Sequence, residues 1–141
     1  MVNHRSLLAE LKVELLSCLE YLEYSYKKTK EQAINLSTND PEELETLEAL
    51  VSRFARSTDI FIAKYLRTYC LKDDPAYSGT LIDTILYAEK FKLIGSAKVW
   101  IEIRELRNKI SHEYARKDLE DIFDQVLKLA PTVLDLKNTI L

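Results

Sequence analysis

The sequence predicts an all-α fold, an up-and-down bundle of four to five helices in a single domain covering residues 1–141. Leucine, glutamate and lysine are abundant, and only two glycines and three prolines are available for turns, which disfavours a turn-rich β protein. Apolar residues recur at alternating steps of three and four, the period of an amphipathic helix. With 141 residues and 47% hydrophobic content, the chain is long enough for one core and too short for two.

A long first helix is expected from about Arg5 to Leu36. Its apolar stripe consists of Leu8, Leu11, Leu15, Cys18 and Leu22. The turn that follows ends in a strong helix-start signal, because Asp40 is a capping residue, Pro41 suits the first helical position and Glu43 stands three residues after the cap.

The second helix is expected to run to about Leu71, which makes it as long as the first. Its stripe consists of Leu47, Val51, Phe54, Thr58, Phe61, Tyr65 and Tyr69. Two helices of this length joined by a short turn must form an antiparallel hairpin. Residues 72–80 contain Pro75 and Gly79, so this segment is expected to be a loop.

A shorter third helix is expected from Leu81 to about Leu93, ended by Gly95. Ser96 is a plausible cap for a fourth helix, from about Ala97 to the vicinity of Glu113 or Arg116.

The last helix is expected to begin after Asp118 as its capping residue. Its stripe consists of Leu119, Ile122, Phe123, Val126, Leu129, Val133 and Ile140. Pro131 lies inside this pattern and has no backbone N–H, so a kink or a new helix start is expected near it.

The fourth helix is predicted to have three faces rather than two. An ordinary core stripe consists of Val99, Ile103, Leu106, Ile110 and Tyr114, and a middle face consists of Trp100, Arg104, Arg107, Asn108, Ser111 and His112. The third face consists of Glu102, Glu105, Lys109 and Glu113. A solvated face needs no tryptophan beside clustered arginine, amide and imidazole groups, so the middle face is expected to contact something other than bulk water.

The order Arg107-Asn108-x-x-x-His112-x-Tyr114, late in a small helical chain, resembles the signature of the HEPN superfamily, and more narrowly that of HepT-like toxins. Arg107, Asn108 and His112 match the core of the family motif, and Tyr114 matches the additional tyrosine of the HepT branch. Residues 50–59 also resemble the second long helix of such proteins, and helix order and chain length agree over nearly the whole sequence.

The resemblance implies a toxin of a type VII-like toxin–antitoxin pair, a metal-independent endoribonuclease that uses the 2′-hydroxyl of RNA as its nucleophile. His112 would transfer protons and Arg107 would bind the phosphate. Arg104, Asn108 and Ser111 would support them. Tyr114 is implied to receive AMP from a partner minimal nucleotidyltransferase antitoxin, whose ATP and Mg²⁺ belong to that partner. No cofactor or metal is expected for this chain.

Other interpretations of the same residues remain open. His112 could be an ordinary helix-end histidine, Arg107 could pair with Ser111 or a glutamate, and Tyr114 could extend the core stripe. Arg107 and His112 would lie about 140° apart on an unbroken helix, so either the helix loosens or a second copy contributes to the site. The alternative function is a non-catalytic helical partner of a small nucleotidyltransferase.

Composition limits the partners. A net charge of −3 gives no global attraction to nucleic acid, so RNA contact would need a local patch, for which the candidates are Arg104, Arg107, Lys109, Arg116 and Lys117.

Cys18 and Cys70 are expected to be small core residues in a reducing cytoplasm. No apolar run is long enough for a membrane span. Homodimerisation through the middle face of the fourth helix is expected, because a second copy would cover Trp100 and its neighbours.

Overall fold

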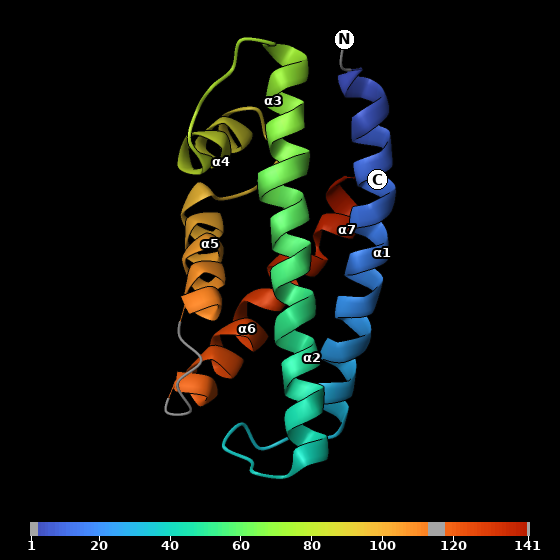
Figure 1. Ribbon diagram of the computed structural model, residues 1–141, viewed down its shortest axis with the longest axis vertical. Coiled ribbons are helices and arrows are strands. Elements are labelled where there is room, and N and C mark those ends of the chain that lie inside the picture. Colours follow the sequence, from blue (N-terminus) through green and yellow to red (C-terminus); the bar gives the residue numbers. More distant parts are fainter. Residues whose placement is uncertain (1–2, 113–117, 141) are drawn as a thin grey trace.

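The structure is a computed structural model that describes residues 3–112 and 118–140. These residues form five main helices, the second of which runs through three segments, and one short C-terminal helix, with no strand, which confirms the all-helical prediction (Figure 1). The two longest helices stand side by side, α5 lies on one side of them, and α6 crosses them obliquely. None of the described helices is both long enough and apolar enough to cross a membrane.

Helix α1 (His4–Glu31) and α2 (Pro41–Thr58) form the predicted antiparallel hairpin. α1 ends earlier than the sequence predicted, because Ala33 adopts a left-handed conformation with φ of 48°. The backbone N–H of Ile34 then donates to the carbonyl of Thr29, and that of Ala33 to the carbonyl of Lys30, which is a Schellman motif with alanine in the place usually taken by glycine. The side chain of Ile34 is folded back into the core.

The start of α2 agrees with the sequence prediction. The side chain of Asp40 accepts a hydrogen bond from the backbone N–H of Glu43 at 3.1 Å, and Pro41 is the first helical residue. The helix continues without interruption through a π-helical segment, η1 (Asp59–Leu66), into α3 (Arg67–Asp73). The predicted end near Leu71 is therefore correct to within two residues.

The π-helical segment was not predicted, and it departs from the burial pattern of a regular amphipathic helix. Three consecutive side chains, Ile60, Phe61 and Ile62, are all buried, whereas a regular amphipathic helix would expose one of them. The segment contacts α1 and α4 as well as its neighbours in the chain. A π-helical turn widens the helix and is frequent at functional sites.

Helix α4 (Leu81–Lys90) begins with a capping box between Thr80 and Asp83. It ends before Gly95, because Lys92 takes the left-handed conformation with φ of 61° and the backbone N–H of Leu93 bonds to the carbonyl of Ala88. The predicted role of Gly95 as the helix terminator is wrong. The same Schellman arrangement ends α1, again without glycine.

Helix α5 (Ala97–His112) starts as predicted, with Ser96 Oγ accepting from the backbone N–H of Val99. Glu89 of α4 adds a second cap by accepting from the backbone N–H of Ala97 at 2.7 Å.

Helix α6 (Leu119–Leu134) follows Asp118, whose side chain makes no capping hydrogen bond. It contains Pro131 and continues to Leu134, and a new short helix, α7 (Leu136–Thr139), starts after Asp135. The predicted new start therefore lies five residues beyond the proline.

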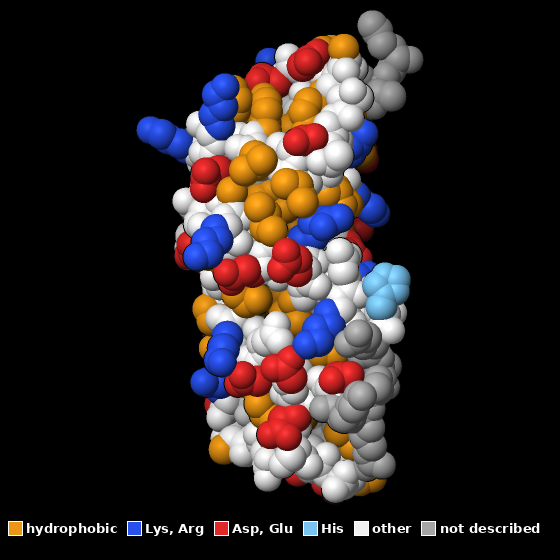
Figure 2. Space-filling view, turned by 90° about the vertical axis from the view of Figure 1, so that its left-hand side faces the viewer, with side chains coloured by type: hydrophobic (Ala, Val, Ile, Leu, Met, Phe, Trp, Pro, Cys, Tyr) orange, Lys and Arg blue, Asp and Glu red, His pale blue; other side chains and the backbone are white. Residues whose placement is uncertain are grey.

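One continuous core joins all five helices. Its largest fully buried side chains are Phe54, Phe61, Phe123, Leu15, Leu19, Leu22, Leu47, Leu50, Leu66, Ile85, Ile103 and Ile122. Cys70 is buried and Cys18 is half-buried, in agreement with their predicted packing role. On the side of the molecule seen in Figure 2, Lys and Arg side chains alternate with Asp and Glu, and hydrophobic side chains gather in the upper half.

Candidate functional site

The motif helix α5 buries more of its surface than the sequence suggested. Its buried residues are Ala97, Trp100, Ile103, Leu106 and Ile110. Trp100 is only 3% exposed, and its ring lies 4.8 Å from that of Phe61 in η1. The expectation that Trp100 needs a second chain to cover it is therefore wrong, because the π-helical segment of the same chain covers it.

Arg107 is held by the first residue of that π-helical segment. Its Nε donates to Asp59 Oδ1 at 2.8 Å and its Nη2 donates to Asp59 Oδ2 at 2.9 Å. Its Nη1 also donates to Ser111 Oγ, one helical turn further along α5. The guanidinium is thus fixed by groups on two helices, and Asp59 and Arg107 lie 48 residues apart in the chain.

The contact with Asp59 does not exhaust the donors of Arg107. A guanidinium has five N–H groups in a planar fork, and the three bonds described above leave two of them, on Nη1 and Nη2, for a further ligand. The Arg107 side chain is 29% exposed. The hydrogen bond from Arg107 to Asp59 raises the pKa of Arg107 further above its ordinary value, so the guanidinium stays charged.

A groove of about 560 Å³ opens beside this pair. It lies between α1, the long helix and α5, and is lined by Glu14, Val51, Ser52, Ala55, Arg56, Asp59, Ile60, Lys64, Arg107 and Ile110. Of the predicted site residues, Arg107 alone lines it. The groove can accept a small anionic group next to the free edge of that guanidinium.

Apart from Ser111, which accepts a hydrogen bond from Arg107, the other predicted site residues are not assembled around Arg107. α5 is unbroken through His112, its last described residue, and His112 is exposed. The helix therefore keeps the predicted angular separation between His112 and Arg107. Asn108 is also exposed. Arg104 is half-buried, and its Nε has no hydrogen-bond partner among the described residues, so no contact supports the role predicted for it. Tyr114 lies outside the described residues.

The predicted basic patch is partly neutralised within the chain. Arg107 is paired with Asp59, and Lys109 is paired with Asp121 at 2.7 Å. The hydrogen bond from Lys109 holds the pKa of the Asp121 carboxyl below its ordinary value. Two further candidates of the patch, Arg116 and Lys117, lie outside the described residues.

Asp59 is the site residue that sequence reasoning missed. The sequence offers one signal, a carboxylate placed directly before the apolar run Ile60–Ile62 on a helix that is otherwise buried there. A carboxylate at such a place usually has a cationic partner. Nothing in the sequence, however, tells which cation that is, because the partner belongs to a different helix.

Comparison of the chain with protein-family models, with curated proteins and with solved structures finds no match. Among the described residues, no group of three or more His, Cys, Asp or Glu side chains is arranged to hold a metal ion.

Proposed function

We propose that this chain is an endoribonuclease toxin that resembles the HepT-like branch of the HEPN superfamily and cuts RNA without a metal ion. The observation that supports the proposal is the arginine of the motif, Arg107, oriented by Asp59 and Ser111 at the wall of a groove with two donors still available. A fixed guanidinium with free donors is suited to stabilising the charge that develops on a phosphate in a transition state.

The proposed reaction is an internal transfer. The 2′-oxygen of a ribose attacks the adjacent phosphorus, the bond from phosphorus to the 5′-oxygen breaks, and the products are a 2′,3′-cyclic phosphate and a free 5′-hydroxyl. His112 takes the proton of the 2′-hydroxyl and returns a proton to the leaving oxygen, which histidine can do near neutral pH. Arg107 binds the phosphate oxygens, and holding attacking and leaving groups in line lowers the entropic part of the barrier.

The geometry of one chain does not complete this site, since α5 keeps Arg107 and His112 on different sides of the helix. We therefore propose a homodimer in which two copies of α5 approach each other, so that the histidine of one copy faces the arginine of the other. Light scattering at micromolar concentration tests this step. A particle with the single-chain mass of 16.4 kDa would contradict it.

The activity is tested by incubating purified protein with single-stranded RNA in excess EDTA. We expect cleavage to persist in EDTA and to be lost in Arg107→Ala and in His112→Ala. Lys128→Ala is a matched control, because Lys128 is a cation with 71% of its side chain exposed on α6. Cleavage that disappears with EDTA, or that is equally strong in both motif variants, would contradict the proposal.

Control by a nucleotidyltransferase partner is the second part of the proposal. AMP attached to the hydroxyl of Tyr114, two residues beyond His112, would place a negative charge and a bulky nucleoside next to the site for RNA phosphate. Intact mass spectrometry after co-expression with the partner tests this. We expect a mass increase of one AMP group or its multiples that is absent in Tyr114→Phe, and unmodified but still neutralised protein would mean inhibition by binding alone.

The second candidate function is a non-catalytic binding partner of such a nucleotidyltransferase. One observation favours it, an exposed apolar surface around α4 in which Ile82, Leu86 and Phe91 are 41%, 49% and 49% exposed. Expression of this chain alone distinguishes the two functions. Growth arrest that requires His112 supports the toxin, whereas harmless expression that His112→Ala leaves unchanged supports the binding partner.

A further inference from the structure

Two exposed tyrosines and an arginine form a cluster on the hairpin of α1 and α2, away from the proposed catalytic groups. Tyr21 and Tyr24 are 59% and 62% exposed, although large aromatic side chains are usually mostly buried. The guanidinium carbon of Arg53 lies 5.5 Å from the centre of the Tyr21 ring and 5.9 Å from that of Tyr24. Both distances are within the range of a cation–π contact.

Arg53 is itself fixed across the hairpin. Its Nη1 donates to the buried Ser25 Oγ at 2.8 Å and to the backbone carbonyl of Tyr21 at 3.2 Å. One α2 side chain therefore orients both rings of α1. Because the rings remain more than half exposed, each can accept another flat group without rearrangement of the helices.

This cluster is continuous with the groove of Arg107. A second groove, of about 520 Å³, is lined by Val13, Glu14, Ser17, Cys18, Tyr21, Arg53 and Arg56. Glu14 and Arg56 line both this groove and the groove of Arg107. A single extended path therefore leads from Tyr21 to the motif arginine along the side of the hairpin, and Tyr24 lines the cavity on the other side of Arg53.

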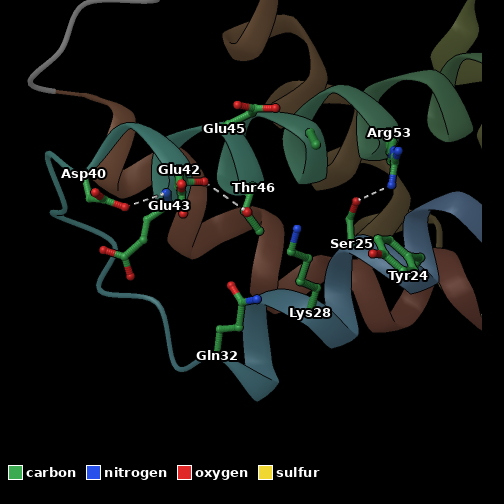
Figure 3. Close-up of a pocket in the computed structure, with 11 residues that line it drawn as sticks. Tyr24, Ser25, Lys28, Gln32, Asp40, Glu42, Glu43, Glu45, Thr46 and Arg53 are labelled. Carbon is green, nitrogen blue, oxygen red and sulfur yellow. Dashed lines mark hydrogen bonds between the residues drawn. The ribbon is translucent and has the colours of Figure 1, made fainter.

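The path has a cationic end and an acidic end. The two grooves together contain four cationic side chains, Arg53, Arg56, Lys64 and Arg107, against two carboxylates, Glu14 and Asp59. Beyond Arg53 the surface continues into a cavity of about 410 Å³ near the α1–α2 turn (Figure 3). The acidic side chains in that cavity are Asp40, Glu42, Glu43 and Glu45.

We propose that this face of the hairpin binds a single-stranded nucleic acid, with bases stacked on Tyr21 and Tyr24 and phosphates at Arg53 and Arg56, and leads the strand to Arg107. The proposal rests on the ribonuclease function for the identity of its ligand. Flat exposed rings beside arginines are the surface that single strands recognise without regard to sequence. Tyrosine and arginine are also enriched at protein interfaces. The row of cations that continues from Arg53 through Arg56 to Arg107, however, matches the repeated phosphates of a strand.

The geometry also limits how much of the strand is held. Arg53 and Asp59 are six residues apart on one helix, which corresponds to about 9 Å at about 1.5 Å per residue. That span suits one or two nucleotides between the tyrosines and Arg107. Tyr24 lines the acidic cavity, whose carboxylates repel phosphate, so the strand is expected to leave the surface directly beyond the base stacked on Tyr24.

The experiment measures binding separately from cleavage. The probe is a fluorescein-labelled single-stranded oligonucleotide with 2′-O-methyl groups, which cannot be cut by attack of its own 2′-oxygen, and the readout is fluorescence anisotropy. We expect Tyr21→Ala and Tyr24→Ala each to weaken binding about tenfold, the loss of one base stacked on an aromatic ring. Arg56→Ala is expected to lower the slope of affinity against salt by about 0.7, the contribution of one phosphate contact.

The matched control is Phe91→Ala. Phe91 is also exposed, at 49%, and Lys90 Nζ lies 5.7 Å from its ring centre, but it directly follows α4 and lines neither groove. Its loss should leave binding unchanged. Circular dichroism of all variants verifies that they are folded, which is expected because the substituted side chains are exposed.

The possible outcomes separate this inference from the ribonuclease proposal. Wild-type binding that requires the tyrosines supports the inference even if the protein cuts no RNA. Unchanged binding in the tyrosine variants, or no binding by the wild type, overturns it even if cleavage is demonstrated. Unchanged binding together with loss of a dimer in the tyrosine variants also overturns it and assigns the face to a second copy of the chain.

Discussion

The long helix from Pro41 to Asp73 is continuous, but its first part, α2, and its middle part, η1, differ in structure and in the contacts that they make. The first half, α2, is a regular α-helix that packs on α1 and α6 and follows the apolar period of its sequence. The middle part, η1, is π-helical, buries consecutive side chains and supplies both Asp59 for Arg107 and Phe61 for Trp100. The regular part, α2, therefore packs against the motif helix itself, whereas the irregular part, η1, orients two of its side chains, Arg107 and Trp100.

The largest effect is expected from the aromatic contact between η1 and α5. Phe61→Ala removes a side chain that is 1% exposed and leaves a cavity beside Trp100, so we expect the free energy of unfolding to fall by about 3–5 kcal/mol. Urea denaturation measures it. Phe91→Ala is the control and should cost only about 1 kcal/mol, because Phe91 is half exposed and its main ring contact is with Tyr87. Equal losses in the free energy of unfolding would show that the packing of Phe61 against Trp100 is no more important for stability than the contacts of Phe91.

The next largest effect is expected from substitution of Asp59. It tests whether Asp59 orients the Arg107 side chain or contributes mainly to the stability of the fold. Asp59→Ala removes two hydrogen bonds to Arg107, so we expect RNA cleavage to fall at least about tenfold because the guanidinium loses its fixed orientation. Stability should fall by about 1 kcal/mol or less, because the pair is partly exposed to solvent.

Single-turnover cleavage, with urea denaturation beside it, measures both quantities for Asp59→Ala. Faster cleavage in this variant would mean that Asp59 competes with the phosphate for Arg107 rather than orienting it.

The start of α2 gives the matching test in the regular half of the helix. Asp40→Ala removes the side-chain cap from the N–H of Glu43, and we expect a loss of about 1 kcal/mol. Asp40→Asn should retain most of the stability, because asparagine caps helices about as well as aspartate. Neither change should alter cleavage by the folded protein, and a large effect on cleavage would contradict the division between scaffold and site.

The smallest effect is expected from a group of ion pairs outside the long helix, and it depends on pH. Glu23 of α1 accepts hydrogen bonds from Lys27 and from Lys137 of α7, which lower the pKa of its carboxyl below the ordinary value of 4.5. Because the pKa is lower in the folded state, the pairs stabilise the fold above pH 4.5 and are lost as the pH falls through the lowered value.

Glu23→Gln is therefore expected to reduce stability slightly at pH 7 and to make no difference at a pH where the carboxyl is protonated in both states. Thermal unfolding of wild type and variant between pH 3 and pH 7 measures the difference. A gap that widens as the pH falls would contradict this sign.

Local sequence rules were sufficient for most of the fold. The capping residue Asp40, the proline after it and the apolar stripes located the hairpin, and Ser96 correctly marked the start of α5. The rules failed where the chain uses a residue against its usual preference. Ala33 and Lys92 take left-handed conformations that favour glycine, so α1 and α4 end earlier than predicted, while Gly95 ends neither.

The sequence by itself determined the helical class, the hairpin and the identity of the polar residues on α5, because capping and apolar period are local properties of the chain. Only the tertiary structure decided what those polar residues contact. The π-helical geometry of η1 turns Phe61 onto Trp100 and brings Asp59 to Arg107 across 48 residues, and no local pattern specifies such a pairing. For the same reason, the exposed rings of Tyr21 and Tyr24 became a candidate surface only when Arg53 was placed over them.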